Sequence, residues 1–220
     1  RHMKRGGAAR QRPEVYRMQA REAEDIQFRK VHDAYTYLED GSPLFPTDVS
    51  RGAVYFIRNP LDVLISFAHH SATEPAKMVD AINDPEKAFG RSPEKLFNQL
   101  RQKLSSWSGH VRSWVDQPNI PVHVMRYEDM RHEPLKVFMD AVKFLELNTN
   151  EEEVKKALNK SDLSVLQDQE QKQGFKEKMI RADKFFRKGK VGEWREVLTN
   201  EQVEIVIKEH KDVMVRFGYL

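Results

Sequence analysis

The chain has 220 residues, enough for one domain with a hydrophobic core, and its 39% hydrophobic and 32% charged residues exclude a disordered protein. No apolar run approaches the roughly 20 residues of a membrane-spanning helix, no signal-peptide pattern opens the sequence, and the absence of cysteine excludes disulfides and thiolate metal sites. The net charge of +3 is too small to indicate nucleic acid by itself. We therefore expect a cytoplasmic protein without a membrane or nucleic-acid partner.

The first elements are expected to be a helix and two strands. Residues 1–24 are polar and predict a helical lead-in, part of which resembles the residue of tag removal. The stretch "DIQFRKVH" (25–32) predicts a short strand that ends in Lys30 and His32. A turn-rich connection leads to a second strand, "AVYFI" (53–57).

The second strand is followed by Arg58 and then by a clear helix start. Asn59 is suited to the N-cap, Pro60 to the first helical position, and the acid Asp62 to the first turn, where the helix dipole favours it. Leucine, isoleucine and alanine then recur at helical spacing up to Ala68.

The rest of the chain alternates helices with one more strand. The expected elements are a long helix at 92–118, a strand at 120–127, a helix at 135–147, a smaller helix at 151–160, a mobile polar loop at 168–178, and a last helix that starts at Thr199 with Gln202 as its capping-box partner. This alternation predicts an α/β fold, a parallel β-sheet with helices on both faces. Ligands of such sheets lie beyond the carboxyl ends of the strands, where Lys30, His32, Arg58 and Tyr127 are expected.

Two stretches have the chemistry of an anion site. The always charged fork of Arg58 suits phosphate oxygens, and the helix N-terminus with Ser66 can add donors. Arg187, Lys188 and Gly189 can form an anion-binding loop. The alternatives are a surface arginine at position 58, a solvated basic loop at 187–189, and a nucleic-acid patch that uses the interleaved aromatic residues of 185–194.

Histidine and tyrosine side chains offer further chemistry. On an extended segment Lys30 and His32 point the same way, so His32 can accept a proton while Lys30 stabilises an anion, although a structural histidine is the alternative. Tyr127 can place its ring on a nucleobase, whereas Glu128 and Asp129 are expected to stabilise the local turn. The adjacent pair His69-His70 is not a metal site, because neighbouring helical side chains diverge by about 100°.

Four stretches together resemble the cytosolic-type sulfotransferases, which use 3′-phosphoadenosine 5′-phosphosulfate (PAPS). They are "FRKVHDAY", similar to the family's Lys-Thr-His segment; "VYFIRNPLDVLISF", similar to its 3′-phosphate strand and helix; "MRYEDMRHEPLKVFMDAVKFLEL", similar to its Tyr-Glu-Asp segment; and "FFRKGKVGEWREVLTNEQ", similar to its Arg-Lys-Gly loop. The resemblance runs from about residue 25 to the end and implies the P-loop-kinase-like sulfotransferase architecture.

The resemblance implies a role for each matching position. His32 would be the general base and Lys30 would support charge at the transferring group. The nucleotide would contact Arg58, Ser66, Tyr127, Ser161, Phe185, Phe186, Arg187, Lys188 and Gly189. PAPS would be the co-substrate and 3′-phosphoadenosine 5′-phosphate (PAP) the product, with no metal. The family's dimer segment resembles 195–204, but Arg195 and Asn200 depart from it, so we expect a monomer or a weak homodimer.

One family motif is absent from the sequence. The family's first strand leads into a loop of the type Pro-Lys-Ser-Gly-Thr-Thr that holds the 5′-phosphosulfate, and no such run occurs here. We therefore expect an N-terminally incomplete sulfotransferase domain over residues 1–220, with candidate substrate lids at 71–95 and 167–184.

The expected function is sulfuryl transfer from PAPS to a hydroxyl of a small-molecule acceptor. Two alternatives follow from the sequence. One is a non-catalytic PAP-binding or interaction protein that lacks the 5′ loop, and the other is a nucleic-acid-binding module that uses the basic residues of 181–195.

Overall fold

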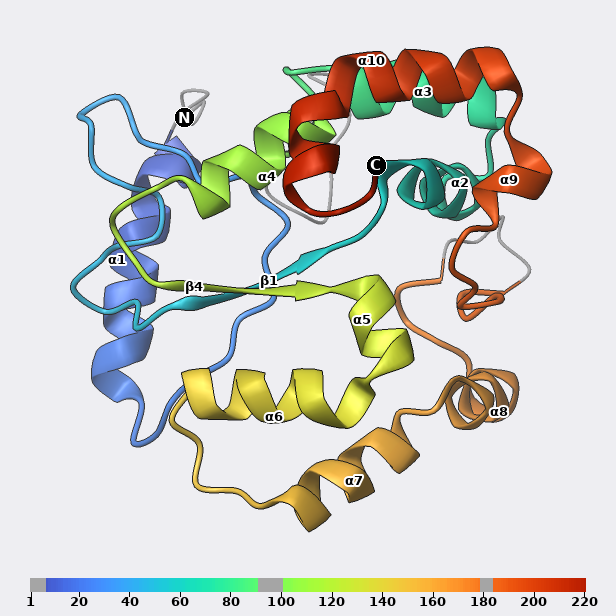
Figure 1. Cartoon of the computed structure of the whole chain (residues 1–220). Helices are drawn as coiled ribbons and strands as arrows, with labels where there is room; N and C mark the ends of the chain where they lie inside the picture. Colours follow the sequence, from blue (N-terminus) through green and yellow to red (C-terminus); the bar gives the residue numbers. More distant parts are fainter. Residues whose placement is uncertain (1–6, 91–100, 179–183) are drawn as a thin grey trace. The chain divides into compact units, whose positions relative to one another are not determined.

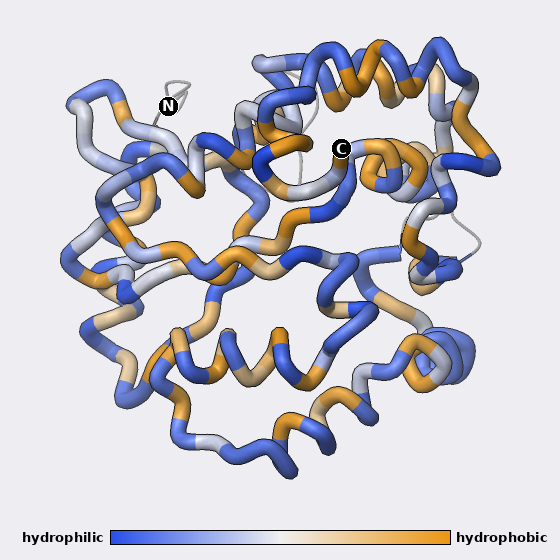
Figure 2. The backbone as a smooth tube through the Cα atoms, viewed as in Figure 1, coloured by the Kyte–Doolittle hydropathy of each residue, from blue (hydrophilic) through white to orange (hydrophobic). Residues whose placement is uncertain are grey.

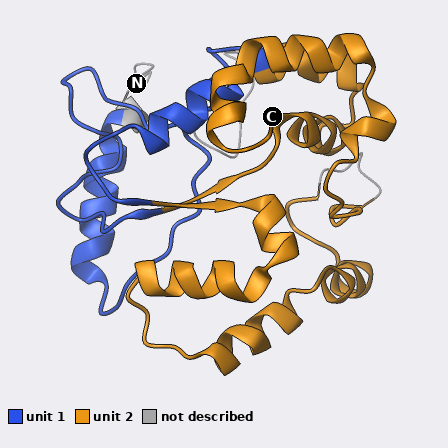
Figure 3. Cartoon of the chain, viewed as in Figure 1, with its two compact units in different colours: residues 1–53, 83–122 blue, residues 54–82, 123–220 orange. Residues whose placement is uncertain are grey.

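The computed structural model describes residues 7–90, 101–178 and 184–220 (Figure 1). In these ranges the elements are α1 (Gly7–Glu22), β1 (Ala53–Ile57), α2 (Pro60–His70), α3 (Pro75–Asn83), β2 (Ala88–Phe89), β3 (Gln102–Lys103), α4 (Trp107–Val115), β4 (Val122–Arg126), α5 (Tyr127–His132), α6 (Pro134–Phe144), α7 (Glu151–Lys160), α8 (Leu163–Gln173), α9 (Trp194–Val197) and α10 (Asn200–Arg216). The chain forms two compact units, residues 1–53 with 83–122 and residues 54–82 with 123–220 (Figure 3).

The second unit is built on the sheet of β1 and β4, which are neighbours although they are far apart in the chain. Their arrows point the same way in Figure 1, with α2, α3 and α10 on one side and α5, α6 and α7 on the other. Ile57 of β1 and Met125 of β4 are buried. This arrangement confirms the expected α/β fold with a parallel sheet and helices on both faces.

Helix α2 begins as its sequence predicts. The Asn59 side chain accepts the N–H of Leu61 at 3.0 Å, and Pro60 is the first helical residue. Leu61, Leu64, Ile65 and Ala68 of α2 are buried, and α2 packs against α10. Helix α10 has the predicted capping box between Thr199 and Gln202. The apolar stripes of α6 and α10 are visible in Figure 2.

The first unit contains α1, β2, β3 and α4. Its core includes an aromatic cluster in which the Trp114 ring lies 5.0 Å from Phe45 and 5.3 Å from Tyr35, centroid to centroid. The buried carboxylate of Asp33 accepts two hydrogen bonds from Arg12 of α1, at 2.9 and 2.8 Å. Neither this unit nor the other has, among the described residues, a helix long and apolar enough to span a membrane.

Three sequence predictions are wrong. Residues 25–32 form no strand, and Ile26 and Phe28 in this stretch are both exposed. The helix predicted at 92–118 is interrupted at residues 101–106, which are not helical; α4 begins at Trp107, where Ser106 caps it, and Ser105 has a φ of +63°. The predicted start at Ser92 lies outside the described residues. Residues 168–173 belong to α8 instead of a loop, because Asp162 caps this helix and Asp168 pairs with Lys172 along it.

Candidate phosphate-binding site

Arg58 lies in the turn between β1 and α2. Its Nη2 donates to the main-chain carbonyl of Lys190 at 2.9 Å, and its guanidinium carbon lies 4.3 Å from the centroid of the Tyr127 ring. The side chain is four-fifths buried, and Nε is buried without a hydrogen-bond partner in the described part of the chain. Arg58 therefore contacts the end of the basic stretch 187–190 through its main chain.

Tyr127 is the first residue of α5 and follows β4 directly. Beside it, the Glu128 carboxylate accepts the N–H of Asn59 at 3.0 Å and the hydroxyl of Tyr219 at 3.1 Å. Glu128 thus joins the end of β4 to the end of β1, as expected for a residue that stabilises the turn. The pKa of Tyr219 is raised, chiefly because its hydroxyl is buried and secondly because the carboxylate of Glu128 is near.

The loop 185–194 is fixed at its start by two side chains of α8. Glu170 accepts the N–H groups of Phe185 and Phe186, at 2.6 and 3.0 Å. Gln167 donates from Nε2 to the carbonyls of Phe186 and Arg187, at 3.0 and 2.7 Å. Neither residue was predicted from the sequence, because both lie in the polar stretch 167–184 that was expected to form a substrate lid.

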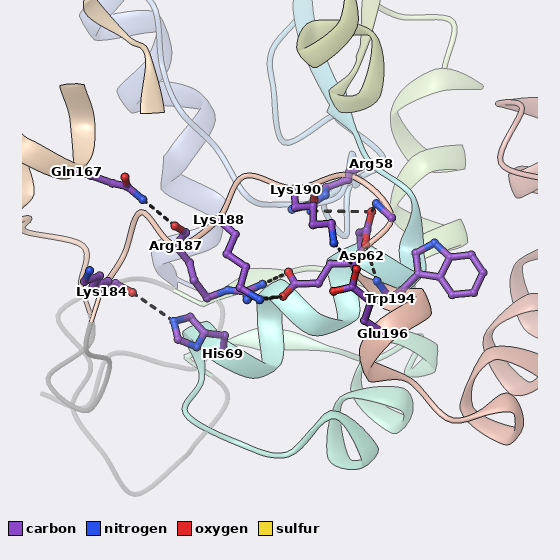
Figure 4. A network of polar contacts seen from close by, with 12 residues as sticks. Arg58, Asp62, His69, Gln167, Lys184, Arg187, Lys188, Lys190, Trp194 and Glu196 are labelled. Atoms are coloured by element: carbon purple, nitrogen blue, oxygen red, sulfur yellow. Dashed lines mark hydrogen bonds and ion pairs between the residues drawn. The ribbon is translucent and has the colours of Figure 1, made fainter. Parts of the chain in front are cut away.

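At the other end of the loop, Asp62 of α2 accepts two main-chain hydrogen bonds. The N–H of Gly192 donates to Oδ2 at 2.7 Å and that of Trp194 to Oδ1 at 3.1 Å (Figure 4). Asp62 is almost completely buried. From the sequence Asp62 was expected only as an acid in the first turn of a helix, and its contact with the loop was not predicted.

Glu193 binds the two cations of the loop. Arg187 donates from Nη1 to Oε1 at 2.6 Å and from Nη2 to Oε2, and Lys188 donates from Nζ to Oε1 at 2.9 Å. Glu193 is only 3% exposed. The hydrogen bonds from Arg187, and then those from Lys188, outweigh the opposing effect of burial and lower the pKa of Glu193 to about 2.

Gly189 brings the centre of the loop close to Tyr127. Its φ is +58°, in the left-handed region that favours glycine. A Cβ added at this position would lie 2.9 Å from Cδ2 of Leu163 and 3.5 Å from the hydroxyl oxygen of Tyr127. Arg58, Tyr127, Gly189 and Lys190 therefore lie close together in the second unit, next to Leu163 of α8.

The other residues predicted to contact the nucleotide also belong to the second unit. Ser66 is exposed on α2. Phe185 and Phe186 pack against Phe175, with ring centroids 4.4 and 4.9 Å away. Ser161 ends α7, and its hydroxyl is directed at the main-chain carbonyls of the preceding turn. Ser161 therefore already has a structural partner in the helix that it terminates.

His32 and Lys30 lie in the first unit, both exposed, in an irregular segment instead of at a strand exit. The His32 ring lies edge-on to Phe89, 6.0 Å between centroids, and its carbonyl lies 3.2 Å from Nε2 of His110. Burial is the main cause that lowers the pKa of His110. The next residue is also held by α4, because Nε1 of Trp114 donates to the carbonyl of Asp33 at 2.9 Å.

The candidate site consists of cations and backbone N–H groups instead of metal ligands. Among residues 7–90, 101–178 and 184–220, no group of three or more histidine, aspartate or glutamate residues is arranged to hold a metal ion. The chemistry that the side chains of the second unit can provide is the binding of an anion, with Tyr127 as an aromatic surface next to it.

Comparison with known proteins identifies the family. The model of the sulfotransferase domain matches residues 14–218. Sulfotransferase 1B1 of Canis lupus familiaris is 27% identical over 166 residues, 71% of this chain and 53% of the relative, and amine sulfotransferase of Oryctolagus cuniculus is 29% identical over 175 residues, 74% and 56%. The chain thus spans about half the length of these curated relatives.

Solved structures show the same fold. Mouse sulfotransferase SULT7A1 complexed with PAP has a TM-score of 0.57 at 20% identity, over 78% of this chain and 62% of that one. Retinol dehydratase in complex with androsterone and inactive cofactor PAP has a TM-score of 0.58 at 22% identity, over 78% and 50%. The family model covers nearly the whole chain, and the fold agrees with it. The chain therefore belongs to the sulfotransferase domain family.

Proposed function

We propose that this chain is part of a PAPS-dependent sulfotransferase that transfers a sulfuryl group to a hydroxyl of a small molecule. In this proposal the site around Arg58 binds the 3′-phosphate of the donor PAPS and of the product PAP. The observation that carries it is the meeting of Arg58 with the main chain of Lys190, because this contact joins the two cationic segments that the family resemblance assigns to one phosphate.

The hydrogen-bonding capacity of Arg58 supports a phosphate ligand. A guanidinium has five N–H donors in a fixed fork, and the Lys190 carbonyl accepts from only one nitrogen. The buried Nε lacks a partner in the described residues, and an unsatisfied buried donor is costly. A phosphate oxygen would satisfy it. The ring of Tyr127, which lies against this guanidinium, would then be next to the nucleoside of the same ligand.

Glu193 leaves Arg187 and Lys188 able to bind a second anion. Arg187 uses two of its five N–H donors on Glu193, and Lys188 uses one of three. Five donors therefore remain for a phosphate. We infer that Glu193 orients the two cations and that the phosphate binds beside its carboxylate without replacing it, in the way that a supporting carboxylate holds a binding group in place.

His32 is the proposed general base. Its ring would take the proton of the acceptor hydroxyl while the hydroxyl oxygen attacks the sulfur of PAPS, and PAP leaves with the electron pair of the broken sulfur–oxygen bond. Lys30 would stabilise charge at the transferring group. The contact of the His32 carbonyl with His110 supports this role, because it holds the backbone of the base to a regular helix.

A second candidate function is PAP binding without catalysis. It is favoured by one observation: the contacts around Arg58 involve the segments that the family resemblance assigns to the 3′-phosphate. The two candidates differ in one assay. A sulfotransferase forms a labelled sulfate ester from labelled PAPS and a panel of small hydroxyl acceptors when a Pro-Lys-Ser-Gly-Thr-Thr loop is supplied in the same polypeptide, whereas a binding protein retains PAP and forms no ester.

The phosphate assignment is tested by calorimetric titration of PAP and of adenosine 5′-phosphate, which lacks the 3′-phosphate. Arg58→Ala should weaken PAP binding by about 10- to 100-fold, because a hydrogen bond to a charged group contributes about 1.5–3 kcal/mol. Adenosine 5′-phosphate binding should stay the same. Lys208→Ala, which removes an exposed charge from α10, is the control and should change neither. An equal loss for both nucleotides in Arg58→Ala would contradict the assignment.

A further inference from the structure

Asp62 is more deeply buried than an acid in the first turn of a helix needs to be. An acid in the first turn of a helix is favoured by the dipole, and this effect needs no burial. Asp62 is nevertheless only 2% exposed. Removing a carboxylate from water is costly unless hydrogen bonds satisfy its oxygens, so a buried aspartate at this place needs specific partners.

The partners of Asp62 come from a segment about 130 residues later in the chain. Each oxygen accepts one main-chain N–H, Oδ2 that of Gly192 at 2.7 Å and Oδ1 that of Trp194 at 3.1 Å. Nη2 of Arg58 lies 4.0 Å from Oδ2. One carboxylate therefore lies between the cation at the end of β1 and the end of the loop 185–194, as Figure 4 shows.

The loop has a backbone conformation that suits this contact. Gly192 has a φ of +78°, and an added Cβ would lie 2.5 Å from Nη1 of Arg195. A side chain at Gly192 would therefore strain the backbone and displace Arg195. The hydrogen bond between Asp62 and Gly192 therefore needs the carboxylate in α2 and a glycine at position 192 of the loop.

We propose that Asp62 is the positioning residue of the 3′-phosphate site. It fixes the end of the loop 185–194 to the first turn of α2 and thereby sets the position of Arg187 and Lys188 relative to Arg58. This inference rests on the proposed function, because it assumes that these cations bind one phosphate. Gln167 and Glu170 hold only the start of the loop. Its later part is joined to α2 by Asp62 and to Arg58 by the carbonyl of Lys190.

The position requires a carboxylate. Both oxygens of Asp62 accept from N–H groups, whereas an asparagine has one acceptor oxygen and one NH₂ group, which would face an N–H donor. Asp62→Asn keeps the size of the side chain and removes one of the two bonds. It is therefore the sharpest variant, and Asp80→Asn, which changes an exposed aspartate of α3, is its matched control.

The experiment measures the affinity ratio of PAP to adenosine 5′-phosphate by calorimetry. In Asp62→Asn we expect PAP binding to weaken at least tenfold with adenosine 5′-phosphate unchanged, and the amides of Gly192 and Trp194 to exchange hydrogen faster. Gly192→Ala should lower the same ratio from the loop side, and it decides the question if Asp62→Asn does not fold. Asp80→Asn should leave the ratio unchanged.

The outcomes separate this inference from the proposed function. If Arg58→Ala lowers the ratio and neither Asp62→Asn nor Gly192→Ala does, the positioning role is overturned and the phosphate assignment stands. If both variants weaken the two nucleotides equally, Asp62 has a general structural role and the inference is also wrong. If Arg58→Ala itself leaves the ratio unchanged, the phosphate assignment fails.

Discussion

Replacing Glu193 by glutamine should destabilise the second unit in a way that depends on pH. A pKa lowered from 4.5 to about 2 means that the folded protein favours the ionised carboxyl by about 3 kcal/mol. Arg187 and Lys188 are 27% and 57% exposed, so solvent screens part of this interaction. We therefore expect Glu193→Gln to lower the free energy of unfolding by about 2 kcal/mol at pH 7.

The sign of the pH dependence follows from the direction of the shift. Because the pKa of Glu193 is lower in the folded protein, its stabilisation is fully present above the ordinary glutamate pKa near 4.5 and is lost as the pH falls through about 2. The difference in stability between the wild type and Glu193→Gln should therefore shrink across this window. Urea unfolding followed by circular dichroism at several pH values measures it.

The control is Glu196→Gln, which changes an exposed glutamate that pairs with Lys190. A surface pair contributes little, so this variant should stay within about 0.5 kcal/mol of the wild type at every pH. The reasoning is refuted if Glu193→Gln unfolds at the wild-type urea concentration at pH 7, or if the difference keeps its full size down to pH 2.

Three further predictions concern the loop, the last helix and the proposed base. Gly189→Ala should lower the free energy of unfolding by about 1–2 kcal/mol and weaken PAP binding severalfold, because it strains a positive φ and brings a Cβ against Leu163. A PAP affinity that calorimetry finds unchanged would contradict the placement of the loop. Thr199→Ala removes the side-chain acceptor of the Gln202 N–H and should cost about 1 kcal/mol in urea unfolding with PAP affinity unchanged, and a loss of affinity would show that α10 influences the site. His32→Ala, in a polypeptide that also has a 5′-phosphosulfate loop, should abolish ester formation and retain PAP binding, and full activity would exclude His32 as the base.

Elements with local signals were predictable from the sequence. The starts of α2 and α10 depend on side chains within three residues of the helix end, and both were correct. The strand expected at 25–32 was wrong because a strand also needs a neighbouring backbone to pair with, and the residues of this stretch alone do not show whether one is present. The helix expected at 92–118 was wrong at residues 101–106, because apolar spacing continues there through residues whose backbone is not helical.

The candidate site was predictable in its cations and not in their partners. Family resemblance indicated Arg58, Tyr127 and the Arg187 loop, and the first two lie in contact. The carboxylates that hold them, Asp62 and Glu193, were not identified, because nothing local shows which acid of a charged sequence is buried. For Glu193 a signal was available, because this acid, the central residue of "GEW", follows Arg187 and Lys188 within six residues and could have been expected to pair with them.

The central claim is that Arg58 and Arg187 bind one phosphate, and a double-mutant cycle on PAP binding tests it most directly. Arg58→Ala, Arg187→Gln and the double variant are titrated with PAP; the glutamine at 187 retains a donor for Glu193. If both guanidinium groups contact the same phosphate, the two losses are not additive and the coupling is about 1 kcal/mol or more. Losses that add to within about 0.3 kcal/mol would mean that the two arginines act independently and would contradict the claim.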